Sequence, residues 1–318
     1  MIRTRYVIEY AALRGTAGLL NALPYRLALA LAWVLAALVF RLSRYRARLA
    51  ETRMLEVFGD RYSAAARRRL AWRAWRNFVF CAVDLVRLRH VTQDWVWKHV
   101  EGCQIACDKL AAHTGTGQGA VLACPHMGAW EVAGVTAQQL GVPIFFLAGR
   151  QKNPLADAYI NRCRARTGID TVLRGSSMLK SVIRRLRQGG VLAFPPDVRV
   201  PTPGPTVMFL GRPANLVGGM AMFARQAGVP IFPVIVTRKS WTQHAVWLGD
   251  PVWPDETVDK RQDWQRMTQS VFTVIEEAIR REPEQWFWFN KRWVLDPVDV
   301  SPPEQQGGQT LPPEGAQE

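Results

Sequence analysis

Two residue types that can carry out acid–base chemistry lie close together in the stretch CPHMGAWE, residues 124–131. His126 is followed, after four intervening residues, by Glu131. An imidazole can take the proton of an attacking hydroxyl, and a carboxylate about one helical turn further on can bind the other ring nitrogen and stabilise the imidazolium. The spacing predicts His126 as a general base and Glu131 as its orienting partner. The pair alone is weak evidence, because a histidine in such a place is commonly a hydrogen-bonded structural residue.

The residues around this pair predict where it lies in the fold. AVLAC (120–124) is a short apolar run that predicts a buried strand, so His126 follows the end of that strand and Glu131 begins a helix. Similar apolar runs predict further strands, and Pro, Gly and capping residues delimit the helices between them. The predicted strands cover residues 120–124, 142–149, 170–173, 190–196 and 229–236, with an edge strand at 245–253. The predicted helices cover residues 154–167, 177–188, 216–227 and 263–281.

The strand-like runs are apolar on both faces, which is typical of a parallel sheet with helices on both sides. Alternating strands and helices indicate an α/β fold with a mostly parallel, mixed sheet covered by helices. In open sheets of this kind, ligands bind beyond the carboxyl ends of the strands, and His126 is predicted to lie there.

The N-terminal region predicts a membrane attachment. Residues 27–40, LALALAWVLAALVF, are fourteen apolar positions followed closely by arginines. A spanning helix needs about 20 residues, and arginines immediately downstream oppose export. We therefore expect residues 1–50 to be a retained anchor, with a buried helix of a soluble protein as the alternative. Residues 51–296 then form the catalytic domain, beginning with a basic helix at 63–89, and the Pro-, Gly- and Gln-rich tail at 297–318 is expected to be disordered.

Composition limits the partners. The chain has 41 Lys and Arg residues against 26 Asp and Glu residues, a formal net charge of +15, which favours anionic lipids, acidic proteins or nucleic acid. Several of its 13 tryptophans, among them Trp72, Trp75, Trp286, Trp288 and Trp293, lie near arginines and fit either a membrane interface or the core. The five cysteines have neither disulfide-framework nor zinc-site spacing, so reduced thiols and no structural metal are expected.

Several blocks in a fixed order resemble one family. HMGAWE (126–131) resembles the His-x4-acid motif of the glycerolipid acyltransferase superfamily, in the form found in the late acyltransferases of lipid A biosynthesis. GRQKNPLADAYINRCRARTG (149–168), residues 204–234 and EPEQWFWFNKRW (282–293) are similar to further blocks of that family. The resemblance covers about residues 1–295.

The resemblance implies transfer of an acyl chain from an acyl carrier protein, or from acyl-CoA, to a hydroxyl of a lipid A precursor, a phosphorylated glycolipid. The reaction would take place at the cytoplasmic face of the inner membrane, with His126 as the base. Arg164 would contact the acceptor phosphate or the developing oxyanion, and Asp197 stands at an acidic position of the family. Arg150 and Arg199 would bind phosphate, which arginine holds bidentately. Neither a cofactor nor a metal is expected.

Two alternatives remain open. FPPDVR (194–199) stands where the lipid A enzymes usually carry an Asp-Gln-Asp type sequence, so the acceptor could instead be a phosphatidylinositol mannoside, an ornithine lipid or a lysophospholipid. A non-catalytic basic protein that binds membrane surfaces or nucleic acid would also fit the charge. Because no DNA- or RNA-binding module is recognisable, a nucleic acid partner is not expected.

Overall fold

The structure is a computed structural model that describes residues 3–148, 151–173, 178–199, 206–216 and 218–296. The predictions for Arg150 and for a disordered tail at 297–318 lie outside the described residues.

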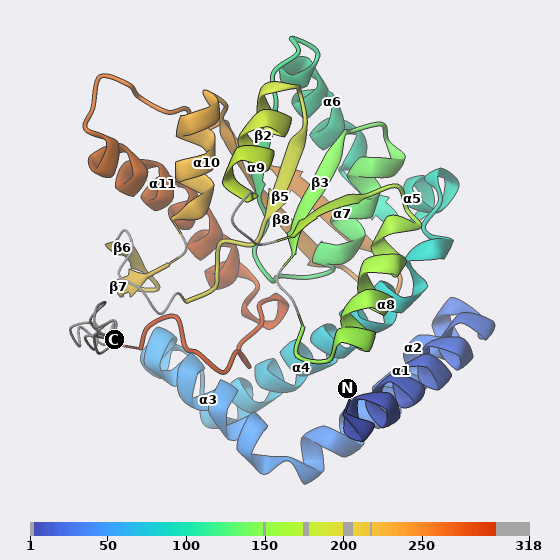
Figure 1. The fold of residues 1–318 in the computed structure, drawn as a ribbon. Helices are drawn as coiled ribbons and strands as arrows, with labels where there is room; N and C mark the ends of the chain where they lie inside the picture. Colours follow the sequence, from blue (N-terminus) through green and yellow to red (C-terminus); the bar gives the residue numbers. More distant parts are fainter. Residues whose placement is uncertain (1–2, 149–150, 174–177, 200–205, 217, 297–318) are drawn as a thin grey trace, which may run out of the picture.

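A seven-stranded sheet forms the centre of the molecule (Figure 1), in the order β1-β9-β8-β2-β5-β3-β4. All neighbouring strands pair in parallel except β8 and β9, which are antiparallel, so the predicted mostly parallel mixed sheet is confirmed. The strands are β1 (Val100–Glu101), β2 (Ala120–Ala123), β3 (Ile144–Ala148), β4 (Asp170–Leu173), β5 (Val191–Phe194), β8 (Ile231–Arg238) and β9 (His244–Leu248). A separate antiparallel hairpin is made of β6 (Thr206–Phe209) and β7 (Arg212–Asn215).

Helices cover both faces of the sheet and one end of it. Figure 1 shows α9, α10 and α11 on one side, α5, α6, α7 and α8 on the other, and α1 to α4 across the bottom. The first four are α1 (Thr4–Ala22), α2 (Tyr25–Leu42), α3 (Arg44–Phe58) and α4 (Ala64–Arg87). The others are α5 (Gln93–His99), α6 (Cys103–Thr114), α7 (Trp130–Gln139), α8 (Pro154–Ala165), α9 (Met178–Arg187), α10 (Gly219–Ala227) and α11 (Lys260–Arg281), with single 3₁₀ turns η1 (Gly59–Arg61), η2 (Leu88–His90) and η3 (Pro283–Gln285).

The central strand β2 explains why both faces need a helical layer. All four of its residues are buried, and they alternate between two hydrophobic cores. Val121 and Ala123 belong to the core on the α10 and α11 side, whereas Ala120 and Leu122 belong to the core on the α6 and α7 side. Alternate residues of a strand face opposite sides, so a strand that is apolar at every position needs cover on both.

The sheet corrects one sequence prediction, and the segment that follows α11 decides an alternative that the sequence left open. β9 is not an edge strand, because the two-residue strand β1 pairs with it on the side away from β8. Residues 282–296, here called the closing segment, fold back against the body, and their tryptophans are core residues. Trp286, Trp288 and Trp293 are only 0–5% exposed, so for these three the core alternative is correct and the membrane-interface alternative is wrong.

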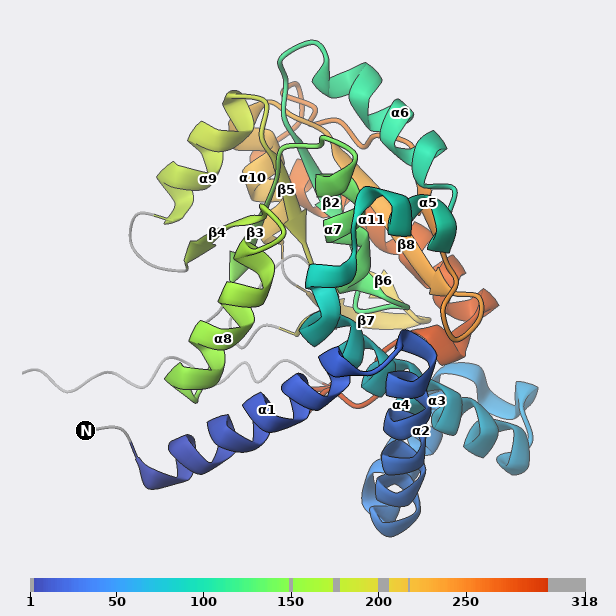
Figure 2. The ribbon, with the colours of Figure 1, turned by 90° about the vertical axis from the view of Figure 1, so that its right-hand side faces the viewer.

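The apolar N-terminal run forms α2, which has one covered and one open side. Among helices of the described residues, α2 alone is long and apolar enough to cross a membrane. Its inner side packs on α4, where the Trp75 indole donates to the Ala36 carbonyl over 3.1 Å, and Leu29 contacts a cluster with Phe80. Its outer side leaves large apolar side chains exposed: Leu27, Trp33, Val34, Leu35, Leu38, Val39 and Leu42. Figure 2 shows α1 and α2 along the lower margin of the molecule.

Helix α4 joins this N-terminal layer to the sheet. Its Asp84 forms a buried ion pair with Arg238 at the end of β8 and accepts a hydrogen bond of 2.6 Å from the Tyr25 hydroxyl at the start of α2. Both charged side chains are almost completely excluded from solvent. A buried ion pair holds together only where each charge keeps a partner, so this contact fixes α2, α4 and β8 in one arrangement.

Candidate active site

The register of two neighbouring strands brings His126 next to Asp197. Ala123, the last residue of β2, pairs with Phe194, the last residue of β5. His126 and Asp197 each follow three positions later, after segments that begin in register. Because parallel strands end at the same edge of a sheet, the two side chains meet beyond it.

The Asp197 carboxylate holds both the ring and the backbone of His126. Its Oδ1 lies 2.8 Å from His126 Nδ1, and its Oδ2 accepts from the His126 amide over 2.8 Å. The same Oδ2 accepts a third hydrogen bond of 2.8 Å from the indole Nε1 of Trp286. The carboxylate is nearly completely buried, and these donors stabilise its charged form.

The pKa of each partner moves in the direction expected for an ion pair. Burial by itself lowers the pKa of His126, but the charge of Asp197 and the hydrogen bond to it raise it, so the net pKa lies above the ordinary histidine value. Burial raises the pKa of Asp197, but His126 and the Trp286 indole outweigh it, so the net pKa lies below the ordinary value. Asp197 therefore stays ionised, and His126 becomes a stronger base than a free imidazole.

The other ring nitrogen of His126 is available for chemistry. A carboxylate only accepts hydrogen bonds, so Nδ1 carries the hydrogen and Nε2 keeps its lone pair. Nε2 has no hydrogen-bond partner among the residues that the structure describes, and the His126 side chain is 28% exposed. Trp130 packs edge-on against the ring, with 5.2 Å between the ring centroids. This is the arrangement of a general base whose tautomer is fixed by a carboxylate.

The predicted contact between His126 and Glu131 is wrong, because the ring partner is Asp197. Glu131 lies in the first turn of α7, where its carboxylate pairs with Arg164 of α8. Arg164 Nη2 donates to Glu131 Oε1 over 2.5 Å, and Arg164 Nε donates to Oε2 over 3.2 Å. This ion pair is mostly buried and lines the same cavity as His126. The charge of Glu131 still helps to raise the pKa of His126, but it ranks behind Asp197 among the causes.

Of the arginines predicted to contact the substrate, two lie within the described residues, and their surroundings differ. Arg164 has two of its three nitrogens engaged by Glu131, so its expected contact with substrate phosphate competes with that pair. Arg199 lies two residues beyond Asp197, is half-buried, and bridges Leu216 through its backbone. Arg150 lies outside the described residues.

Residues 124–129, here called the His126 loop, are held by the closing segment. The Phe287 amide donates to the His126 carbonyl over 3.1 Å, and the Gly128 amide donates to the Gln285 carbonyl over 2.9 Å. The Gln285 side chain in turn bonds both the amide (2.9 Å) and the carbonyl (3.1 Å) of Arg238. Gly128 has a positive φ of 58°, and a Cβ there would collide with the Val236 carbonyl, so the loop can approach β8 only with glycine at this position.

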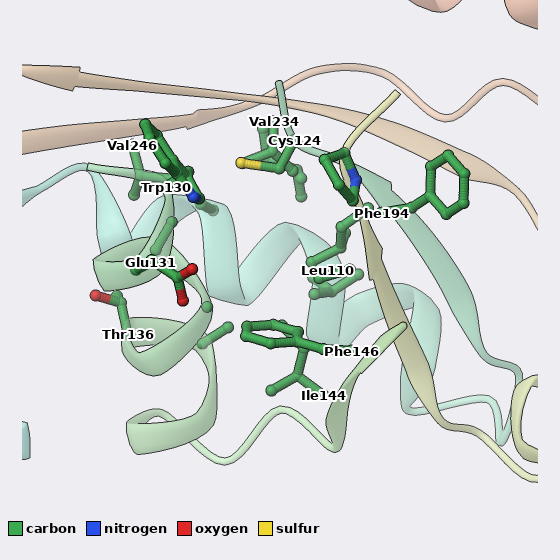
Figure 3. Close-up of a pocket in the computed structure, with 18 of the residues that line it drawn as sticks. Leu110, Cys124, Trp130, Glu131, Thr136, Ile144, Phe146, Phe194, Val234 and Val246 are labelled. Atoms are coloured by element: carbon green, nitrogen blue, oxygen red, sulfur yellow. The ribbon is translucent and has the colours of Figure 1, made fainter. Parts of the chain in front are cut away.

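A cavity of about 160 Å³ (Figure 3) has His126 among the residues that line it. It lies between the sheet and helices α6 and α7, and its walls are mostly apolar, with His126, Glu131, Thr136 and Arg164 among the few polar groups. The apolar lining includes Leu110, Leu122, Ile144, Phe146, Val234 and Leu248. Such a space suits a hydrocarbon chain better than a polar ligand.

No metal site accompanies these groups within the described part of the chain, where no three His, Cys, Asp or Glu residues gather closely enough to hold an ion. The chemistry described above uses only the protein's own side chains.

Comparison with known proteins agrees with the geometry. The chain matches the family described as bacterial lipid A biosynthesis acyltransferase over residues 2–294. It is also similar to the phosphatidylinositol mannoside acyltransferase of Mycolicibacterium smegmatis, with 27% identity over 198 residues, 61% of this chain and 63% of the relative. The protein of the same description from Mycobacterium tuberculosis is 27% identical over 193 residues, 59% of each chain. The chain therefore spans less than two thirds of the length of these curated relatives.

Replacement of Asp197 by Asn tests the assignment of the histidine partner. Without the carboxylate, burial dominates, so the pKa of His126 should fall from above the ordinary value of about 6.5 to below it. A ¹H–¹⁵N NMR titration of labelled histidine measures this directly. Glu131→Gln is the matched control and should lower the pKa less. A larger decrease in Glu131→Gln than in Asp197→Asn would restore Glu131 as the partner.

Proposed function

Because this chain belongs to the bacterial lipid A biosynthesis acyltransferase family, we propose that it transfers a fatty acyl chain from a thioester to a hydroxyl of a phosphorylated glycolipid. One observation carries this proposal beyond the family. His126, with Nδ1 bound to Asp197 and Nε2 without a partner among the described residues, lines a mostly apolar cavity. The base and the acyl-binding space therefore adjoin.

The proposed reaction begins at His126 Nε2. This nitrogen takes the proton of the acceptor hydroxyl while the oxygen attacks the thioester carbonyl, forming a tetrahedral intermediate. The intermediate collapses to the ester, and the leaving thiolate takes the proton back from Nε2. Asp197 remains ionised throughout and stabilises the imidazolium that exists between the two steps.

The oxyanion of the intermediate needs hydrogen-bond donors. Helix α7 begins at Trp130, four residues after His126, and its N-cap residue, Ala129, makes no capping side-chain hydrogen bond. The amides at a helix N-terminus favour negative charge, so we assign them the stabilisation of the oxyanion. Arg164 is the alternative donor, since it lines the same cavity and its contacts with Glu131 use only Nε and Nη2.

The acceptor is proposed as a glycolipid that carries phosphate. The family supports a lipid A precursor, and the similarity to the mycobacterial acyltransferases supports a phosphatidylinositol mannoside. Both present sugar hydroxyls and phosphate. Arg199, two residues beyond Asp197, and Arg150, known from sequence alone, are the proposed phosphate contacts. The donor is proposed as an acyl carrier protein or acyl-CoA, both of which are anionic and match the net charge of +15.

We propose that the protein lies on the cytoplasmic face of the inner membrane, with α2 in the plane of the interface. Support comes from the outer side of α2, which exposes only apolar side chains between Arg26 and Arg41. The inner side follows α4 along its whole length, from Tyr25 with Asp84 at one end to Phe40 against Trp72 at the other. The first half of α4 carries Arg67, Arg68, Arg69 and Arg73, so a spanning α2 would draw these charges into hydrocarbon.

Replacing His126 by Gln tests the proposed chemistry. We expect turnover to fall by about 10²- to 10⁴-fold, because the general base is lost while the cavity remains. Purified protein should be assayed with acyl carrier protein and CoA thioesters against both proposed acceptors, with product masses measured by mass spectrometry. His90→Gln, at an exposed histidine, is the control and should keep full activity. Turnover in His126→Gln within a few-fold of wild type would exclude this mechanism.

The membrane face is tested by placing charges on α2. The double variant Leu35→Glu, Leu38→Glu should bind anionic phospholipid vesicles at least about tenfold more weakly, because two apolar side chains no longer enter the interface. Vesicle flotation measures the bound fraction. Ile105→Glu combined with Met208→Glu, at exposed apolar residues elsewhere, should bind as the wild type does. Equal losses in both double variants would contradict the assignment of α2.

A further inference from the structure

The depth of the cavity can be followed along the strands. Leu122 of β2, Ala193 of β5 and Phe146 of β3 pair in one row, and all three line the cavity. Ile144, the first residue of β3, lies one row deeper on the same face, level with Ala120. The row of Ile144 lies four residues, roughly 13 Å, from the level of Cys124, at the mouth of the cavity.

Three side chains close the inner end. Helices α6 and α7 connect to the parallel strands β2 and β3, so they run against the strand direction and their C-terminal parts reach the depth of Ile144. Leu110 of α6 and Ala137 of α7 line the cavity there. We call Leu110, Ala137 and Ile144 the cavity floor. All three are buried, whereas His126, beyond the ends of the strands, is partly exposed, so we place the entrance of the cavity at His126 and its inner end at the floor.

We infer that the cavity floor determines the greatest acyl length that the protein accepts. This inference rests on the proposed function, because it requires the thioester carbonyl at His126 and the methyl end of the chain at the floor. Each methylene that finds apolar cover improves binding by roughly fourfold. A chain one methylene too long either displaces the packed side chains of the floor or keeps one methylene outside the cavity. The gain in affinity per methylene therefore ends at one chain length.

The Phe146 ring is held in place in the wall of the cavity. A longer acyl chain is therefore expected to find room only where the cavity floor is changed. The Phe146 ring lies against Gly134 of α7 so closely that a Cβ at residue 134 would overlap it. The Arg164 guanidinium lies over the Phe146 ring, 5.6 Å from its centroid, and is itself paired with Glu131. Figure 3 shows Phe146 next to Ile144, on the side of the cavity away from Cys124 and Val234. The ring therefore has a fixed place in the wall.

The experiment measures the affinity of wild type and variants for free fatty acids of 10 to 18 carbons by isothermal titration calorimetry, and acyl transfer from the corresponding CoA thioesters. In the wild type, affinity should rise by roughly fourfold per methylene up to a certain chain length and rise no further beyond it. We call this chain length the break. Ile144→Ala deepens the floor and should move the break about two carbons longer. Ala137→Leu fills the floor and should move it shorter by a similar amount. Ile144→Val provides a milder variant, with a smaller shift in the same direction.

Ile231→Ala is the matched control. Ile231 is as deeply buried as Ile144, but it belongs to the core on the opposite face of the sheet, so its truncation should leave the break unchanged. Breaks that stay in place in both Ile144→Ala and Ala137→Leu, or move equally in Ile231→Ala, overturn the inference. If the breaks move as expected but no thioester is turned over, the floor is supported as a limit on chain binding and the proposed acyl transfer fails separately.

Discussion

The buried charge of Asp197 is the constraint on which the site depends. A carboxylate that is almost fully excluded from water stays ionised only where donors surround it, and here three donors do so. Two of these donors belong to His126, and the third belongs to Trp286, which lies 160 residues after His126 in the chain. The same contacts that keep Asp197 charged also fix the tautomer of His126. Loss of any one donor would therefore weaken both the position of the base and its basicity.

The fold supplies these donors by bringing the closing segment back to the His126 loop. Gln285 bonds Arg238 of β8 through its side chain and Gly128 through its carbonyl, while Arg238 pairs with Asp84 of α4. Cys81 of α4 donates to the Gly128 carbonyl over 3.1 Å. Helix α4 thus contacts the His126 loop on one side and the apolar helix α2 on the other. The proposed membrane face and the proposed general base are separated by a single helix.

Sequence patterns predicted the elements better than their partners. Apolar runs placed five of the strands of the sheet within a few residues, and they placed His126 after a strand end. Local spacing favoured Glu131 as its partner, but the true partner depends on β2 lying beside β5, and strand order is not encoded within either strand. Once β2 and β5 are known to be neighbours, the pairing can be read from the chain, because His126 and Asp197 each follow the end of their strand by three residues. Trp286 gave no such signal, because an indole beside charged residues fits a membrane interface as well as a buried donor.

The central claim is that a neutral His126, made more basic by Asp197, removes the proton of the acceptor. The most direct test is the pH dependence of kcat/KM for acyl transfer, set beside the titration of His126 in the same protein. The acid limb of kcat/KM reports the essential base of the free enzyme. The account predicts that activity falls as the pH decreases through the pKa of His126, above the ordinary value of about 6.5. A limb near the pKa of a free carboxyl group, or no limb between pH 5 and 8, would contradict it.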